Sequence, residues 1–170
     1  MNNKRIFAFL VLFFLTIVLT TTRPSSALTS PDRPTAFGEG EFTFRNMLHD
    51  RIESWAFSFD ANVNKNGKGK GRAQFDNLTA QTGVEIKLDC VSIFTSEAVM
   101  SGKVLHSDDP DFPKGVEVIF AAVDGSQVPV PFFPDQITPI FSLEGLGFDC
   151  TAGGPLTILP LDSGEIVVQP

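Results

Sequence analysis

Apolar and polar residues alternate along most of this chain after residue 37, and this period of two is the feature that most constrains its fold. Successive side chains of a β-strand point to opposite faces, so a strand with one buried face shows this pattern, whereas a helix repeats every 3.6 residues. In residues 54–61, Trp55, Phe57 and Phe59 share one face and alternate with smaller or polar side chains. Turn-forming residues interrupt the alternation at short intervals, which predicts short strands joined by turns.

The pattern predicts an all-β domain: a single antiparallel β-sandwich or β-barrel of about eight strands. Both architectures bury one face of each strand, so the sequence leaves the choice between them open. Residues 116–123 are apolar on both faces apart from Glu117, which favours a central strand. The phase of the alternation changes near Cys90, which predicts a β-bulge there. The expected strands lie at residues 39–45, 54–61, 69–78, 84–94, 97–106, 116–123, 140–144 and 165–168.

The N-terminal segment has the order of a cleavable secretory signal. Lys4 and Arg5 precede an apolar run at residues 6–19, and small residues end the segment at Ala27. The run is shorter than the roughly 20 residues of a membrane-spanning helix, so we expect cleavage after Ala27 rather than an integral membrane protein. The predicted organisation is a signal peptide at 1–27, a flexible lead-in at 28–36 and a β-domain at 37–170. The predicted location is the cell envelope or the extracellular space.

Charge restricts the partners of the exported chain. The sequence contains 13 basic and 20 acidic residues, a net charge of −7. Lys4, Arg5 and Arg23 would leave with the signal and no acidic residue would, which brings the net charge to about −10. Such a surface is a poor partner for a phosphate backbone, so we expect no nucleic-acid binding.

Cys90 and Cys150 are the only cysteines, and an even number in an exported chain predicts a disulfide. Closing a loop of this size would destabilise the unfolded chain by on the order of 4 kcal/mol. The alternative is two separate buried thiols. Two cysteines and the distant His49 and His106 supply too few soft ligands for a metal site, and no cofactor is expected.

Several short segments resemble a family of small exported bacterial β-domains. They are Gly-Glu-Gly at 38–40, the aromatic strand at 55–61, Thr-Gly-Val at 82–84 and the closing strand at 164–168. The positions of the two cysteines fit the same pattern. The resemblance covers nearly all of residues 37–168 and implies an all-β fold and export, but no particular function.

One candidate cation site lies in the loop that follows residue 106. Asp108, Asp109 and Asp111 place three carboxylates close together in sequence, and clustered oxygens are the ligands that Ca²⁺ prefers. The alternative is a solvated turn between two strands, which Pro110 favours.

A second candidate, for contact with a partner or ligand, lies in the proline-rich segment 128–134. Three prolines favour an extended path, and the adjacent Phe132 and Phe133 cannot both face one side of a strand. One interpretation is a lid that closes one end of the core. The other is an exposed hydrophobic contact surface.

No catalytic residue is assigned. His49 and His106 are the only histidines, and no nucleophile-elbow, zinc-protease or phosphate-loop motif accompanies them. We therefore expect a non-catalytic binding or structural module, whose partner would be a protein, a carbohydrate or an apolar small molecule. The alternatives are a β-barrel that binds a small apolar ligand and, less favoured, a carboxylate-based hydrolase. Asn77 also begins a glycosylation sequon, which matters only in a eukaryotic source.

Overall fold

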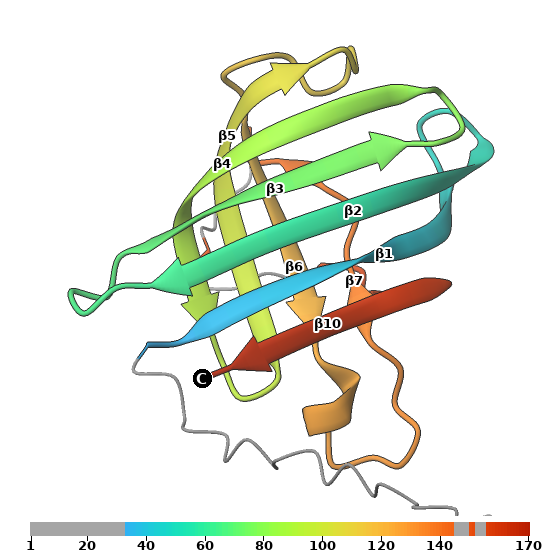
Figure 1. Cartoon of the computed structure of the whole chain (residues 1–170). Helices are drawn as coiled ribbons and strands as arrows, with labels where there is room; N and C mark the ends of the chain where they lie inside the picture. Colours follow the sequence, from blue (N-terminus) through green and yellow to red (C-terminus); the bar gives the residue numbers. More distant parts are fainter. Residues whose placement is uncertain (1–32, 145–149, 152–155) are drawn as a thin grey trace, which may run out of the picture.

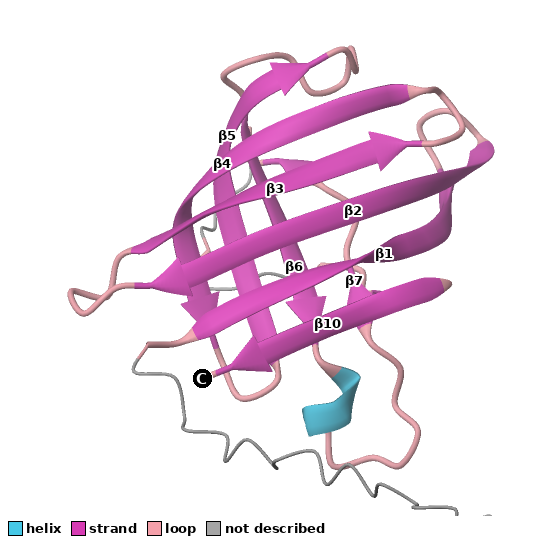
Figure 2. Cartoon of the chain, in the orientation of Figure 1, coloured by secondary structure: helices cyan, strands magenta, loops and turns pink. Residues whose placement is uncertain are grey.

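The computed structural model describes residues 33–144, 150–151 and 156–170, and its strands form one antiparallel sheet (Figure 2). The expected all-β class is confirmed, with ten strands rather than about eight, and the sheet does not close on itself. The strand order is β10-β1-β2-β3-β4-β5-β6-β7-β9, and β8 pairs with β6 beside this path. The elements are β1 Thr35–Asn46, β2 Arg51–Val63, β3 Gly69–Asn77, β4 Thr82–Ile93, β5 Glu97–Ser107, β6 Glu117–Val123, the 3₁₀ turn η1 Gly125–Gln127, β7 Gln136–Ile137, β8 Phe141–Ser142, β9 Leu159–Pro160 and β10 Ser163–Gln169.

The sheet curls so that its two halves face each other. Strands β10, β1, β2 and β3 cross in front of β5 and β6 at a steep angle, and β4 bends from one half into the other (Figure 1). The pairing of β4 with β5 shifts register between Glu85 and Ile86 and again between Leu88 and Cys90. The bulge predicted near Cys90 is therefore confirmed, and such bulges sharpen the bend of a strand. None of the helices among the described residues is long and apolar enough to cross a membrane.

Aromatic side chains fill the middle of the interior. Phe42, Phe75 and Phe120 are fully buried. The ring of Phe120, from the rear half, meets the ring of Phe75 edge to face at 5.0 Å between centroids and that of Phe59 at 5.8 Å. Each such pair stabilises the fold by about 0.5–1.5 kcal/mol beyond the contribution of the apolar area that it buries. The two halves are thus held together by the rings of Phe59 and Phe75, from alternating positions, and by that of Phe120, from the strand that is buried on both faces.

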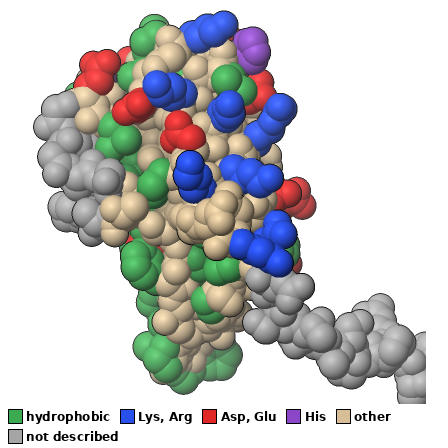
Figure 3. Space-filling model, turned by 90° about the vertical axis from the view of Figure 1, so that its left-hand side faces the viewer, with side chains coloured by type: hydrophobic (Ala, Val, Ile, Leu, Met, Phe, Trp, Pro, Cys, Tyr) green, Lys and Arg blue, Asp and Glu red, His purple; other side chains and the backbone are tan. Residues whose placement is uncertain are grey.

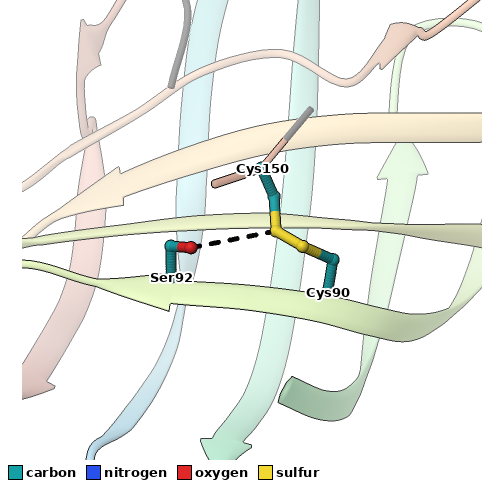
Figure 4. Close-up of a disulfide and its surroundings, with 3 residues drawn as sticks. All are labelled: Cys90, Ser92 and Cys150. Atoms are coloured by element: carbon teal, nitrogen blue, oxygen red, sulfur yellow. Dashed lines mark hydrogen bonds between the residues drawn. A yellow bond between two sulfur atoms is a disulfide. The ribbon is translucent and has the colours of Figure 1, made fainter. Parts of the chain in front are cut away.

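Strands β5 and β6 are buried on both faces, as expected for a central strand at 116–123. On their outer face, Val99, Ile119 and Ala121 pack with Cys150 and with partly buried side chains of the chain after β6. The predicted disulfide between Cys90 and Cys150 is present, with 6.1 Å between the Cα atoms. The Ser92 hydroxyl lies 4.0 Å from the sulfur of Cys150 (Figure 4). The disulfide therefore fastens this outer layer to β4.

Side chains join the two ends of the open sheet. The buried Asp124 accepts a hydrogen bond from the backbone N–H of Val168 in β10 at 3.1 Å. The Gln127 amide donates to the carbonyl of the same residue. Asp135 accepts from the N–H of Ile166. Residues of the β6–β7 linker thus occupy the hydrogen-bonding edge of β10, where a closed barrel would have a neighbouring strand.

Candidate ligand pocket at one end of the sheet

A pocket of about 940 Å³ opens at the end of the sheet where β1 turns into β2. The β3–β4 turn and the β5–β6 loop lie at the same end, because antiparallel strands return there in turn. Two other depressions, on the outer face of β10 to β4 and beside the β3–β4 turn, are more open and expose less apolar surface. The apolar wall of the pocket includes Phe44, Trp55, Phe112, Ile140, Phe141 and Leu159.

The carboxylate of Glu53 lies at the base of this pocket. Glu53 belongs to the inward-facing set of β2, two residues before Trp55, and its side chain is only 1 % exposed. It accepts hydrogen bonds from Trp55 Nε1 at 3.0 Å, Asn77 Nδ2 at 3.1 Å and Arg51 Nε at 2.8 Å. Trp55 in turn packs edge to face against Phe112. A buried carboxylate is thereby satisfied by donors from two neighbouring strands.

The polar side chains around Glu53 control its charge. Burial acts to raise the pKa of its carboxyl, but side-chain hydrogen bonds from Trp55, Arg51, Asn46 and His49 outweigh burial and lower the pKa from 4.5 to about 2. Glu53 is therefore an anion throughout the neutral range. A carboxylate of such low pKa is a weak proton acceptor and is not protonated for use as a general acid.

His49 bridges two carboxylates at the rim of the pocket. Its Nδ1 lies 3.3 Å from Glu53 Oε1, and its Nε2 lies 3.4 Å from Asp111 Oδ2. The imidazole thereby connects the β1–β2 turn with the β5–β6 loop. A neutral imidazole donates through one nitrogen only, whereas the protonated ring donates through both.

The β1–β2 turn also contributes apolar side chains to the rim. Met47 and Leu48 line the pocket, yet they are 80 % and 88 % exposed. The turn is held by Asn46, whose side-chain oxygen accepts from the N–H groups of Leu48 and His49. The structure thus presents two large apolar side chains at the entrance, next to the polar groups around Glu53.

The three aspartates proposed as a cation site have separate partners. Asp108 accepts from the N–H of Gly83, Asp109 accepts from the hydroxyl of Thr82, and Asp111 faces His49. No group of three or more His, Cys, Asp or Glu side chains among the described residues is arranged to hold a metal ion. Asp109 and Asp111 instead belong to the lining of the pocket.

The proline-rich segment lies at the opposite end of the sheet, after β6. Phe132 is 103 % exposed and Phe133 is half-buried. Phe132 therefore covers no part of the core, and neither phenylalanine lines the pocket.

Glu53 is the residue that the sequence reasoning missed. The signal was present, since Glu53 shares the inward parity of Trp55, Phe57 and Phe59, where an acidic residue must be buried and paired. The sequon residue Asn77 is also buried, and its amide donates to Glu53. In this conformation that nitrogen is not accessible to a glycan.

Comparisons with models of protein families, with curated proteins and with solved structures found no match for this chain.

Proposed function

We propose that this protein is an exported, non-catalytic binding protein that holds a small, mostly apolar molecule in the pocket beside the β1–β2 turn. The observation that carries the proposal is the combination of an apolar wall with one pre-ordered polar cluster around Glu53. Ligand sites in proteins are typically clefts of roughly 300–1,000 Å³ with mainly apolar walls and a few placed polar groups. The pocket has this size and composition.

The polar cluster favours binding over hydrolysis. A glycosidase-type mechanism needs one carboxylic acid that is protonated near neutral pH and a second carboxylate. The low pKa of Glu53 makes this residue unsuited to the first role, and its lone pairs are engaged by three or more donors. We assign Glu53 the role of holding Trp55 and Arg51 in place, so that the apolar wall keeps one shape.

The proposed ligand contacts the aromatic wall with its apolar part and places a hydrogen-bonding group at the rim, beside His49 and Asp111. The amphipathic rim supports this assignment, because Met47 and Leu48 are exposed at the same entrance. Export is supported by the order of residues 1–27 and by the disulfide, which is typical of oxidising compartments.

Titration with N-phenyl-1-naphthylamine, an uncharged apolar fluorophore that brightens when it leaves water, tests the proposal. We expect saturable binding to the exported protein. Met47→Ser combined with Leu48→Ser should weaken it about tenfold, because these changes remove apolar contact area at the rim. Ala80→Phe places a ring at an exposed lining position. This variant should also bind the probe more weakly, because the new ring occupies part of the pocket.

Ile52→Ser is the matched control. Ile52 is 69 % exposed and neighbours Glu53 in sequence, but it does not line the pocket. Affinity should be unchanged in this variant. Absence of saturable binding, or equal affinity in the rim variants and the wild type, would refute the proposal.

A further inference from the structure

We propose that the end of the molecule opposite the pocket is a lipid-binding surface that enters the outer part of a bilayer. The surface, called here the apolar tip, consists of Phe94 in the β4–β5 turn and of residues 125–134 after β6. Phe94, Val130 and Phe132 are 48 %, 54 % and 103 % exposed, and Pro129, Pro131 and Pro134 are exposed beside them. The two loops meet at their bases, where Asp124 N–H donates to the carbonyl of Ser96 at 2.8 Å.

The apolar tip carries no charge. Residues 91–96 and 125–134 contain no Asp, Glu, Lys or Arg, although the chain as a whole has 13 basic and 20 acidic residues. In Figure 3, hydrophobic side chains gather at the lower end of the molecule, where Figure 1 places η1 and the loop after it. The Lys and Arg side chains of the same face lie above that end. A surface that leaves water for lipid must lack charges in this way, because each buried charge is costly.

Most backbone N–H groups of the tip loop have partners within or directly beside the loop. Hydrogen bonds within the segment or to its two flanking aspartates occupy the N–H groups of residues 125–128, 130 and 133. Positions 129, 131 and 134 are prolines and have no N–H. Phe132 alone, within this fully described loop, keeps an N–H without a partner. Of the carbonyl oxygens in this segment, those of Gly125, Val128 and Val130 accept a backbone N–H. Pairing of the N–H groups lowers the cost of removing the loop from water, and the outer part of a bilayer still offers water to the remaining carbonyl groups.

The loop holds Phe132 away from the protein in a strained conformation. Its φ of +61° lies in the left-handed region, which is costly for a residue other than glycine or asparagine. The exposed ring gains no packing within its own chain in return. Asp124 and Asp135 fix the two ends of the loop to β10, so the ring is presented on a rigid base. In Figure 1 the loop after η1 projects below the ends of the strands, so it can reach a lipid surface before the rest of the sheet does.

A tryptophan scan with brominated lipid tests the proposal directly. Phe132→Trp places an indole at the tip, and Ile52→Trp places a matched indole at an exposed apolar site of the opposite end. Trp55, the sole native tryptophan, gives a constant background in both. Each variant of the exported protein is mixed with vesicles of phosphatidylcholine brominated in its acyl chains, or with the same lipid containing phosphatidylglycerol. Both variants carry the same N-terminal segment, so any lipid affinity of that segment does not distinguish them.

We expect the fluorescence of Phe132→Trp to shift to the blue and to be quenched by the brominated lipid, and that of Ile52→Trp to stay unchanged. Neutral vesicles should bind at least as well as anionic ones, because the protein is acidic and the contact is apolar. In sedimentation with unlabelled vesicles, Phe132→Ser combined with Val130→Ser should lower the partition coefficient of the protein between buffer and vesicles about tenfold or more.

Lack of quenching at position 132 in both kinds of vesicle, or equal quenching at position 52, would overturn the proposal. Self-association that depends on Phe132, without quenching, would assign the tip to a second copy of the chain instead. The fluorophore titration of the pocket is unaffected by either result, because the pocket lies at the other end of the sheet.

Discussion

Asp135 uses both of its carboxylate oxygens to join the β6–β7 linker to the edge strand β10. Its Oδ2 accepts from the backbone N–H of Ile166 at 2.7 Å, and its Oδ1 accepts from the N–H of Gly125 at 2.8 Å. An edge strand normally leaves such N–H groups free to pair with another chain. Together with Asp124, Asp135 thus protects the edge that the unclosed sheet would otherwise expose.

Asp135→Ala should lower the free energy of unfolding by about 1–3 kcal/mol, because two part-buried donors lose their acceptor. Asp135→Asn should cost less, since its single carbonyl oxygen can still serve one of them. Urea unfolding measures both, and amide exchange at Ile166 should accelerate in the alanine variant. Asp162→Ala, at an exposed position in the turn between β9 and β10, is the control. Equal stability of Asp135→Ala and the control would show that the carboxylate does not hold the edge.

Glu53 predicts a specific loss of stability in acid. Its pKa in the folded protein, about 2, lies below the ordinary value of 4.5, so the unfolded chain binds the proton first. The stabilisation is complete above pH 4.5 and disappears as the pH falls towards 2, with a total of up to about 3 kcal/mol. Urea unfolding between pH 6 and pH 2.5, a range set by these pKa values, should show a shallower pH dependence for Glu53→Gln than for the wild type. Glu39→Gln, on the exposed face of β1, should follow the wild type. Parallel curves for the wild type and Glu53→Gln would contradict the assignment.

The disulfide should stabilise the outer layer more than the aromatic core. Cys90→Ser combined with Cys150→Ser removes a link between positions 60 residues apart, and we expect a loss of about 2–4 kcal/mol in unfolding free energy. The rings of Phe75 and Phe120 pack without help from the bridge. Amide exchange should therefore rise first at the residues of β5 and β6 whose side chains pack against Cys150. Treatment with a reductant should reproduce the loss in the wild type and change nothing in the double variant.

The long strands could be predicted from the sequence because their signal is local. Alternation places Phe42, Phe57 and Phe75 on one face whatever the rest of the chain does, and the structure buries all three. The two-residue strands β7 and β9 have no such signal. β9 includes Pro160, which has no backbone N–H to donate. β7 forms because it lies beside β6, and β9 forms because it lies beside β7.

The pocket depends on distances along the chain that a local pattern does not contain. Phe112 and Ile140 come from loops more than fifty residues after Trp55, and the return of antiparallel strands to one end brings them together. The hydrogen bonds of Asp124 and Asp135 to β10 are equally non-local. In the sequence, these two residues cannot be distinguished from any other aspartate of a turn. Glu53 is different, because its position among inward-facing aromatic residues was readable.

The backbone of Phe132 gives a prediction about stability that separates strain from packing. Glycine adopts a φ of +61° at little cost, so Phe132→Gly relieves strain while losing no contact within the chain. We expect its free energy of unfolding to equal or exceed that of the wild type by up to about 1 kcal/mol. Val130→Gly, at a neighbouring position without a positive φ, should instead lose about 0.5–1 kcal/mol through the greater freedom of the unfolded chain. Urea unfolding of the two variants is the measurement. If both variants lose the same free energy of unfolding, the backbone of Phe132 is not strained. The positive φ of Phe132 would then have no cost for the stability of the fold.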